Sequence, residues 1–461
     1  MTPTTPLPAR PDLGHLKNQA EALARSFAAG DREARARVAA IPRLQDLAHG
    51  PPRSLTVAQS LLVIAREYGF PSWPSLKRHV ESRRGRAVEE AAMNTLKINL
   101  NASSKTAGAA PLAGLDLGST GMRAILLDKS GDGVVAAGLA AGETGADSAE
   151  SAPALSNLRR DCGFPLHRVA VALSGRHANL RAGEMPKMGS EEFRKALPYE
   201  IEQYLPINPG ESVMDFEIQG DSKGDPSKMN ALLAAGRADA AKALLELAAG
   251  AGLEPGIVDV DELALANMFA FNYGDDPAYR DGTCLVNVGN RLTSIIILSD
   301  GGFRFARPTM LGGETLTKDL RMEFGLDMWQ AEEFKREKGK IVVENSPSLA
   351  PSMLEKGNNV LRAAEAMMGT LNKLLAEIKR CLDFYETKID ARGVARILLC
   401  GGGSRLRNLD RFLGDKLELP VEFANPFRKI RVDAGIPGAG LAVSHAAHFG
   451  VAVGLALRRF D

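Results

Sequence analysis

The sequence has few cysteines, and none of them is paired in a way that suggests chemistry. Its 461 residues contain four cysteines and no Cys-x-x-Cys pair. Three of the four lie in apolar runs, so we interpret them as buried thiols in a reducing compartment. This argues against disulfides and against a cysteine metal site. The cysteines are Cys162, Cys284, Cys381 and Cys400.

Long apolar runs and a strong net charge are also missing. No stretch of 18 apolar residues occurs, and the N-terminus lacks the apolar segment of a signal peptide, so we expect no membrane span and a cytoplasmic chain. The net charge of +1 predicts no general attraction to nucleic acid or to an anionic membrane. With 45% hydrophobic and 25% charged residues, the chain has the composition of a globular protein, and its length predicts two or more domains.

The pattern of apolar residues changes along the chain. Residues 1–92 carry apolar side chains at helical spacing, which predicts a small helical module. Residues 93–110 are rich in Asn, Ser, Ala and Gly, as linkers are. From residue 111 onward, short β-rich runs alternate with helices, which predicts an α/β core.

Two segments of this core follow one plan. Residues 113–128 read as strand, glycine turn and strand, residues 284–298 repeat this order, and each pair turns into a third strand. Two similar halves that each open on a three-stranded meander predict a duplication. Three pairs of residues at the two turns are 171 positions apart: Asp116 and Asn287, Gly118 and Gly289, and Ser119 and Asn290.

The residue types in these turns suit a bound phosphate. Glycine lets the backbone come close to a phosphate, and amide and hydroxyl groups donate to its oxygens. A carboxylate at the end of a strand can hold magnesium, and an arginine nearby can neutralise phosphate. A single hairpin of this kind is also explained as a plain Gly/Ser turn, but two that face each other across a cleft favour phosphate binding. The residues of the first turn are Asp116, Gly118, Ser119, Thr120 and Arg123.

Three further segments fit the same site. Gly312 and Gly313 open a predicted helix, whose N-terminus is a natural anion site. An amphipathic helix over residues 371–385 carries Lys379 and Arg380. A buried strand then runs into Gly401-Gly-Gly-Ser404, where glycines would let a flat group lie against backbone; a tight strand-to-helix turn is the alternative.

Together these segments resemble the superfamily of actin, hexokinase and DnaK-type chaperones, in which phosphate-1, phosphate-2 and adenosine motifs follow in this order. Within it, residues 111–461 are similar to PilM, the family of cytoplasmic actin-like proteins of type IV pilus assembly that is related to FtsA. The similarity is carried by Ala172-Leu-Ser-Gly175, Glu200-Ile-Glu-Gln-Tyr-Leu-Pro206, Ala251-Gly-Leu-Glu-Pro255 and Val451-Ala-Val-Gly-Leu-Ala-Leu-Arg458. It implies an α/β, actin-like (ribonuclease H-like) duplicated two-domain fold with a small inserted subdomain, preceded here by the small all-α module.

The resemblance also implies how the core divides. We expect a helical module (1–92), a linker (93–110), the first actin-like half (111–185), an inserted subdomain (186–256), a return to the first half (257–281), the second half (282–440) and a C-terminal helix (441–461).

For the site, the resemblance implies ATP with Mg²⁺, the metal being held at Asp116. Asp261 or Glu262 would orient an attacking water; the alternative is that they cap the helix that begins near Leu263. The superfamily usually has Asp where this chain has Asn287, and an amide cannot act as a base or as a strong magnesium ligand. We therefore expect at most a weak ATPase. The implied nucleotide contacts are Asp116, Gly118, Ser119, Thr120, Arg123, Asn287, Gly289, Asn290, Gly312, Gly313, Lys379, Arg380, Gly401, Gly402, Gly403 and Ser404.

The implied partner is a PilN-like single-span membrane protein, whose cytoplasmic tail resembles Ile-Asn-Leu-Leu-Pro. Residues 96–101, Leu-Lys-Ile-Asn-Leu-Asn, are similar to that tail and are either a tethered mimic or a coincidence. The leading hypothesis is thus an ATP-dependent adaptor at the inner membrane, with self-association left open. The alternatives are an FtsA-like filament protein, although the chain ends without the membrane helix of FtsA, a type II secretion platform component, and a metabolite kinase.

Overall fold

The computed structural model describes residues 13–41, 44–49, 54–77, 111–131, 133–144, 148–205, 207–222, 224–300, 302–342 and 359–460. The chain divides into two compact units, Met1–Ala91 and Ala92–Asp461. The predicted linker, with the tail-like segment 96–101, lies outside the described residues, so the hypothesis of a tethered mimic stays a prediction.

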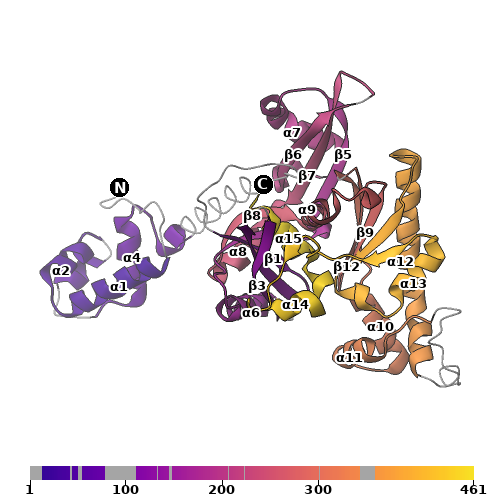
Figure 1. Cartoon of the computed structure of the whole chain (residues 1–461). Helices are drawn as coiled ribbons and strands as arrows, with labels where there is room; N and C mark the ends of the chain where they lie inside the picture. The colour runs from indigo at the N-terminus through magenta and orange to yellow at the C-terminus, as the bar shows by residue number, and fades with distance from the viewer. Residues whose placement is uncertain are drawn as a thin grey trace. The chain divides into compact units, whose positions relative to one another are not determined.

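The described part of the first unit is helical, which confirms the predicted all-α module (Figure 1). Its helices bury one shared apolar core that includes Leu16, Phe27, Val38 and Ile64. A capping box between Thr56 and Gln59 starts the last of the long helices, because each side chain there accepts from the backbone of the other. The helices are α1 (Leu13–Ala28), α2 (Arg32–Ala39), α3 (Gln45–His49), α4 (Val57–Glu67) and a short helix over 73–77.

The second unit contains two large sheets that repeat one strand order. The first runs β14-β3-β2-β1-β4-β8 and the second β11-β10-β9-β12-β13. In each, an antiparallel meander is followed by two strands parallel to its first strand. The shared order and directions confirm the predicted duplication. The strands of the first sheet are β1 (Leu112–Leu117), β2 (Gly121–Ser130), β3 (Gly133–Glu143), β4 (Arg168–Leu173), β8 (Glu254–Val260) and β14 (Ile430–Arg431); those of the second are β9 (Thr283–Val288), β10 (Thr293–Ser299), β11 (Gly302–Thr309), β12 (Arg396–Cys400) and β13 (Val421–Phe423).

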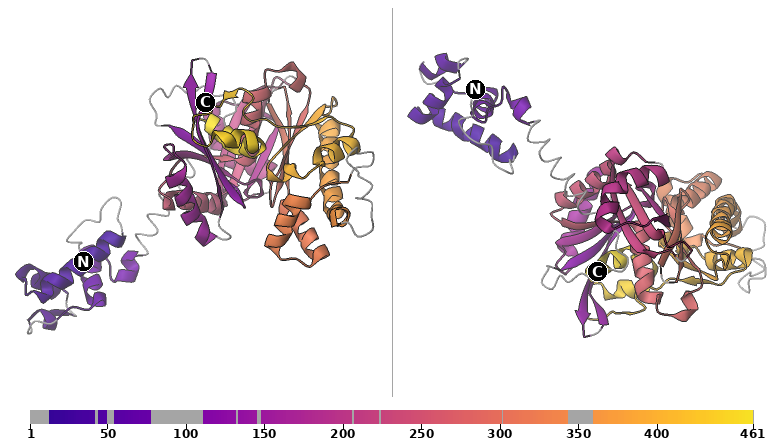
Figure 2. Two further views of the ribbon diagram at one scale, coloured as in Figure 1. Left: turned by 60° about the horizontal axis from the view of Figure 1, so that its bottom comes forward. Right: turned by 90° about the horizontal axis from the view of Figure 1, so that it is seen from above.

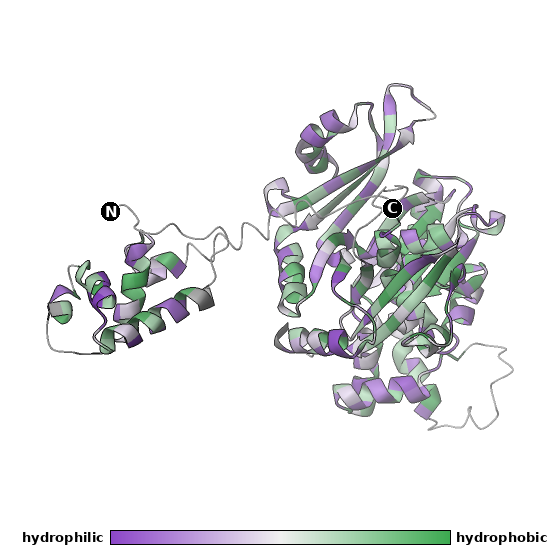
Figure 3. Cartoon of the chain, turned by 60° about the vertical axis from the view of Figure 1, so that its left-hand side comes forward, coloured by the Kyte–Doolittle hydropathy of each residue, from purple (hydrophilic) through white to green (hydrophobic). Residues whose placement is uncertain are grey.

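Helices cover these sheets, and the apolar strands stand out in green in Figure 3. Figure 2 shows the second half, with its orange helices, beside the magenta first half. Helix α15 is buried along its whole length and packs against α9 and β1, which explains why its sequence is apolar on every side. The helices are α6 (Ser148–Asp161), α8 (Ala238–Gly250), α9 (Asp261–Tyr273), α14 (Ala439–Ser444) and α15 (Gly450–Leu457) on the first half, and α10 (Gly313–Phe324), α11 (Met328–Lys338), α12 (Asn359–Lys388) and α13 (Leu409–Leu417) on the second.

A third, smaller sheet is inserted into the first half, at the top of Figure 1. Its three antiparallel strands, in the order β5-β7-β6, pack against α7 (Ser190–Tyr204) over a core in which the rings of Phe193 and Phe216 meet edge to face at 4.5 Å. Strand β5 begins before the predicted limit at residue 186, and α8 packs against β4 and β8 of the first half. The strands are β5 (Ala178–Pro186), β6 (Ser212–Asp221) and β7 (Lys228–Arg237).

Two connections join the halves and are tied to each other. One runs from α9 to β9 and the other from β13 to β14. The guanidinium of Arg428 lies 5.0 Å and 5.3 Å from the ring centroids of Tyr273 and Tyr279, and it pairs with Asp276 at 2.7 Å. The backbone N–H of Asn425 donates to the Tyr273 hydroxyl at 2.7 Å. The two described connections between the halves thus share one aromatic and ionic cluster.

Candidate functional site

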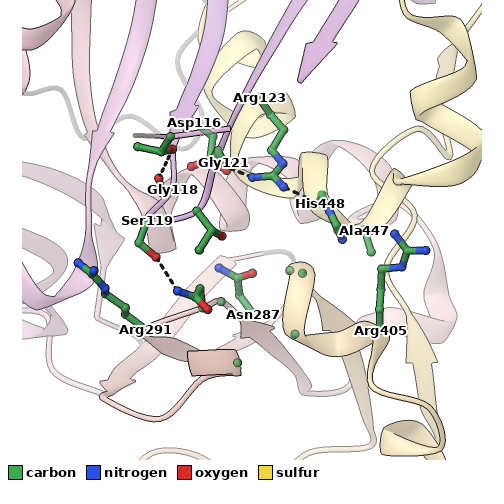
Figure 4. Close-up of a pocket in the computed structure, with 18 of the residues that line it drawn as sticks. Asp116, Gly118, Ser119, Gly121, Arg123, Asn287, Arg291, Arg405, Ala447 and His448 are labelled. Atoms are coloured by element: carbon green, nitrogen blue, oxygen red, sulfur yellow. Dashed lines mark hydrogen bonds between the residues drawn. The ribbon is translucent and has the colours of Figure 1, made fainter. Parts of the chain in front are cut away.

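A cleft of about 1280 Å³ lies between the two halves, and both predicted glycine turns open into it (Figure 4). This is more than the few hundred Å³ that a small ligand usually needs. Its walls also include the triple-glycine loop, one face of α11 and the segment before α15. The described residues of both halves therefore line one shared cavity.

The two turns have the same backbone geometry. The N–H of Gly118 donates across its turn to the carbonyl of Gly121 at 3.1 Å, and the N–H of Gly289 donates to the carbonyl of Leu292 at 2.9 Å. A β-carbon at Gly118 would stand 2.8 Å from the Gly121 oxygen, and one at Gly289 would stand 2.6 Å from the Leu292 oxygen. Only glycine fits either turn as built.

The turns face each other across the cleft. The side-chain amide of Asn290 donates to the hydroxyl of Ser119 at 3.5 Å, and these residues occupy equivalent positions in the two halves (Figure 4). This long, weak contact bridges the two sides of the cleft. The duplicated turns are therefore related in space as well as in sequence.

Two carboxylates line the floor of the cleft. Asp116 ends β1, opposite Arg123 in the β1–β2 pairing, and Asp261 begins α9. Burial raises the pKa of Asp116 to about 6, although the positive charge of Arg123 acts in the other direction. Burial, together with the charges of Asp116, Glu262 and Asp259, also raises the pKa of Asp261 well above its usual value. Both shifts express the cost of placing a negative charge where water solvates it poorly, and for Asp261 the neighbouring negative charges add to that cost.

Glu262, the other predicted water-orienting residue, points away from the cleft. Its carboxylate is buried and accepts from the Ser294 hydroxyl at 2.7 Å. Gly175 leaves room for it, since a β-carbon there would stand 2.0 Å from its oxygen. The capping alternative also lacks support, because the N-cap of α9 is Val260 and no side chain caps the helix.

The triple-glycine loop follows β12 and touches the second turn. Gly401 has a φ of +81°, and a β-carbon there would stand 2.4 Å from the side-chain oxygen of Asn287. Gly402 is the open member, since the nearest atom to a β-carbon would be Nε2 of His448 at 3.7 Å. The Ser404 hydroxyl turns inward and donates to the Gly401 carbonyl at 2.7 Å. This loop presents bare backbone to the cleft.

Helix α11 contributes charged groups that the sequence interpretation did not select. The ammonium group of Lys335 donates to Gly313 O at 2.9 Å, to Thr317 Oγ1 at 2.8 Å and to Glu332 Oε2 at 2.6 Å. Burial lowers the pKa of Lys335, although the Glu332 carboxylate opposes this. Both side chains line the cleft beside Gly313, where α10 begins.

Arg123 is held in place on the opposite wall. It donates through Nη1 to the carbonyl of Gly121 at 2.8 Å, and its Nη2 lies 3.3 Å from Nδ1 of His448. His448 belongs to the short 3-10 helix η7 (Ala446–Phe449) that precedes α15. In turn, the backbone N–H of Gly401 donates to Ala447 O at 2.9 Å.

Comparison with known proteins agrees with this architecture. A family model described as type IV pilus assembly protein PilM matches residues 114–460. The chain belongs to the PilM family. A solved structure titled PilM-PilN type IV pilus biogenesis complex is 26% identical with a TM-score of 0.65, and it covers 76% of this chain and 99% of that one.

More distant relatives of the PilM-family core are bacterial cell-division and cell-shape proteins. Cell division protein FtsA of Bacillus subtilis (strain 168) is 23% identical over 315 residues, which is 62% of this chain and 70% of FtsA. Cell shape-determining protein MreB of Escherichia coli (strain K12) is 24% identical over 205 residues, 40% of this chain and 56% of MreB. The matched region thus spans little more than half of MreB.

Most of the predicted contact residues of this PilM-family chain line the cleft, but some do not. Gly312 lies behind the second turn, where a β-carbon would stand 2.5 Å from the carbonyl oxygen of Asn290. Lys379 and Arg380 lie on α12 outside the cleft lining, and Arg380 pairs with Glu377 at 2.5 Å, so we leave both out of the site. Glu262 and Ser404 lie behind the cleft lining, where the Glu262 carboxylate accepts from Ser294 and the Ser404 hydroxyl donates to the Gly401 carbonyl. The predicted residues that line the cleft are Asp116, Gly118, Ser119, Thr120, Arg123, Asp261, Asn287, Gly289, Asn290, Gly313, Gly401, Gly402 and Gly403.

Two absences hold for the described residues. None of the helices there is long and apolar enough to cross a membrane. No group of three or more His, Cys, Asp or Glu side chains in that part of the chain is arranged to hold a metal ion.

Proposed function

We propose that this PilM-family protein binds ATP with Mg²⁺ in the cleft, and that nucleotide binding controls how it engages a PilN-like partner. The observation that carries the proposal is the pair of equivalent glycine turns, which face each other across one cavity and are bridged by Asn290 and Ser119. Two sets of backbone donors that converge on one place suit a polyphosphate.

Each wall has a separate part in holding the nucleotide. The turns at Gly118 and Gly289 would bind phosphate oxygens through backbone N–H groups, and Arg123 would add positive charge. The bare backbone at Gly402 suits a flat base, and Glu332 lines the same cleft, where its carboxylate accepts from Lys335 and Thr317. Bound Mg²⁺ would neutralise phosphate charge. Asp116 and Asp261 fit a cation whose remaining ligands are phosphate and water, because burial raises the pKa of both carboxyl groups and a bound cation would compensate for the poorly solvated negative charge.

Hydrolysis is expected to be weak or absent. An amide at Asn287 cannot take a proton, and the carboxylate of Glu262 is already bound to Ser294. Asp261 is the one carboxylate among the predicted water-orienting residues that reaches the cleft. ATP would then act as a ligand that holds the halves together, which is a shift between open and closed populations.

The second part of the proposal concerns the partner. The membership in the PilM family and the likeness to the solved PilM-PilN complex support a role as a cytoplasmic adaptor that binds the cytoplasmic tail of a PilN-like protein at the inner membrane. An extended tail could add to an exposed strand edge by backbone pairing. A type II secretion platform would use the same arrangement.

Calorimetry with Mg-ATP tests the nucleotide site. We expect wild-type protein to bind, and Asp116→Ala to weaken binding about tenfold or more through loss of the cation-holding carboxylate. Gly402→Val should also weaken it, because the added side chain would project into the open part of the cleft. Binding at micromolar concentration that survives both changes together would exclude this site.

A synthetic peptide containing Ile-Asn-Leu-Leu-Pro tests the partner. We expect tighter binding to the protein with Mg-ATP than to the nucleotide-free protein, and a scrambled peptide should bind to neither. Equal affinity with and without ATP would overturn the coupling and leave the adaptor role intact. Sedimentation with Mg-ATP separates this role from that of an FtsA-like filament protein.

A further inference from the structure

His448 occupies a position between the first phosphate turn and the triple-glycine loop. Its Nδ1 lies 3.3 Å from Nη2 of Arg123 on β2 (Figure 4). Its Nε2 would lie 3.7 Å from a β-carbon at Gly402 of the loop. It lines the cleft that both elements form. The imidazole is therefore in contact with one half at one nitrogen and beside the other half at the second nitrogen.

The partner at Nδ1 decides which nitrogen carries the proton. A guanidinium has only donors, so Nδ1 must accept from Arg123 and cannot itself hold a hydrogen. The neutral ring then carries its proton on Nε2. This nitrogen is buried and has no hydrogen-bond partner among the described residues. The cleft thus contains a fixed N–H donor without an acceptor, and such a group is costly to leave unpaired.

The surroundings keep this imidazole neutral. Burial lowers the pKa of His448 to about 4, and the charges of Arg123 and of His445, Arg405 and Arg336 act in the same direction. These four groups come from β2, the segment before η7, the triple-glycine loop and α11. The ring can therefore accept from Arg123 throughout the physiological pH range.

We propose that His448 is a nucleotide-positioning residue: it fixes the guanidinium of Arg123 through Nδ1 and offers its Nε2–H to the nucleotide beside Gly402. This rests on the proposed ATP site and adds a residue from the C-terminal segment to it. One imidazole would then sense both the phosphate side and the nucleoside side of the ligand. The turn, the loop and the start of α15 would be coupled when the cleft is filled.

Histidine-selective ¹⁵N NMR tests the first half of the proposal without any nucleotide. The wild-type and His448→Gln spectra together assign the signal of His448. We expect the Nε2–H tautomer, unchanged between pH 8 and pH 5.5, and conversion to a mixture of tautomers in Arg123→Met. An Nδ1–H tautomer, or titration near pH 6.5, would overturn the assignment.

A double-mutant cycle on Mg-ATP affinity tests the second half. We expect His448→Phe to weaken binding by up to about tenfold, which is the upper end of the loss that one neutral hydrogen bond corresponds to. His448→Gln should recover most of it, because an amide has both an acceptor and a donor. In an Arg123→Met background the cost of His448→Phe should shrink to about threefold, since the two residues act partly as a unit.

The controls separate positioning from folding. His167→Phe makes the same chemical change at an exposed surface histidine and should leave affinity unchanged. The thermal midpoint of each nucleotide-free variant shows whether it is folded. Fully additive costs, or a His448→Phe protein that is folded and binds ATP like wild type, would overturn the proposal. If wild-type protein binds no ATP, the proposed function fails, and the NMR result alone still decides the contact with Arg123.

Discussion

The first phosphate turn offers a sharp test, because a single methyl group would disturb it. In Gly118→Ala the new carbon would stand 2.8 Å from the carbonyl oxygen of Gly121, about half an ångström inside the distance such atoms tolerate. The turn must open to relieve this contact. Forced adjustments of this size cost about 1–3 kcal/mol, or about 5- to 150-fold in an equilibrium constant. Since the opening displaces the N–H donors of the turn, we expect Mg-ATP affinity to fall by about that factor.

Gly133, which begins β3 just beyond the other end of β2, provides a matched control. A β-carbon at Gly133 would lie 3.8 Å from the Ser130 oxygen, an ordinary contact, so Gly133→Ala should bind Mg-ATP like wild type. Calorimetry on both variants gives the affinities, and circular dichroism of the nucleotide-free proteins gives their thermal midpoints. A folded Gly118→Ala protein that binds ATP as tightly as Gly133→Ala would refute the view that this turn cradles phosphate.

Four other changes test different parts of the structure. Arg458→Met removes the buried guanidinium that lies 3.3 Å from the Asp259 carboxylate, so urea unfolding should show that the free energy of unfolding falls by about 3–5 kcal/mol. Adding Asp259→Asn should restore much of this stability, and an equal loss in the single and the double variant would contradict the reasoning. His448 has a folded-state pKa of about 4 against 6.5 in the unfolded chain, so its contribution to stability is present above pH 6.5 and is lost as pH falls toward 4. After allowance for partial exposure, this contribution is about 1–2 kcal/mol. In His448→Gln the free energy of unfolding should therefore change less between pH 6.5 and pH 4 than in the wild type. Asn287→Asp restores the carboxylate that the superfamily usually has, and a phosphate-release assay should detect at least severalfold faster ATP hydrolysis; an unchanged rate means that the amide is not what limits turnover. Arg428→Ala removes the ion pair and the ring contacts that join the two connections, so hydrogen exchange over residues 274–282 should accelerate, and unaltered exchange there would rule out a role in the hinge.

The turns could be read from the sequence because their chemistry is local. Gly118 and Gly289 are required by a hydrogen bond that closes within four residues, and the 171-residue offset between the halves makes the pattern visible twice. The duplicated sheets follow in the same way, since each half repeats its order of strands and turns. Local backbone geometry restricts which residue types can occupy a position, and a duplication shows the same restriction twice.

The cleft residues that the sequence misplaced or did not reveal differ from the prediction for one physical reason. Asp261 and Glu262 are neighbours in sequence, but α9 turns one into the cleft and the other toward Ser294. Lys335 and Glu332 look like the solvated face of a helix until α11 is placed beside the cleft. Which face of a helix meets the ligand depends on how the helix packs, and the spacing of residues along the chain does not determine that packing.

The sequence by itself determined that this chain has a helical module, a duplicated α/β core of the PilM family, two glycine turns and an amide in place of a carboxylate. Those features depend on residue type and on order along the chain. Only the tertiary structure decided which of the candidate charges reach the cleft, and that His448 meets Arg123, 325 positions away. Contacts of this kind form when α15 packs against the first sheet, so no local pattern of residues predicts them.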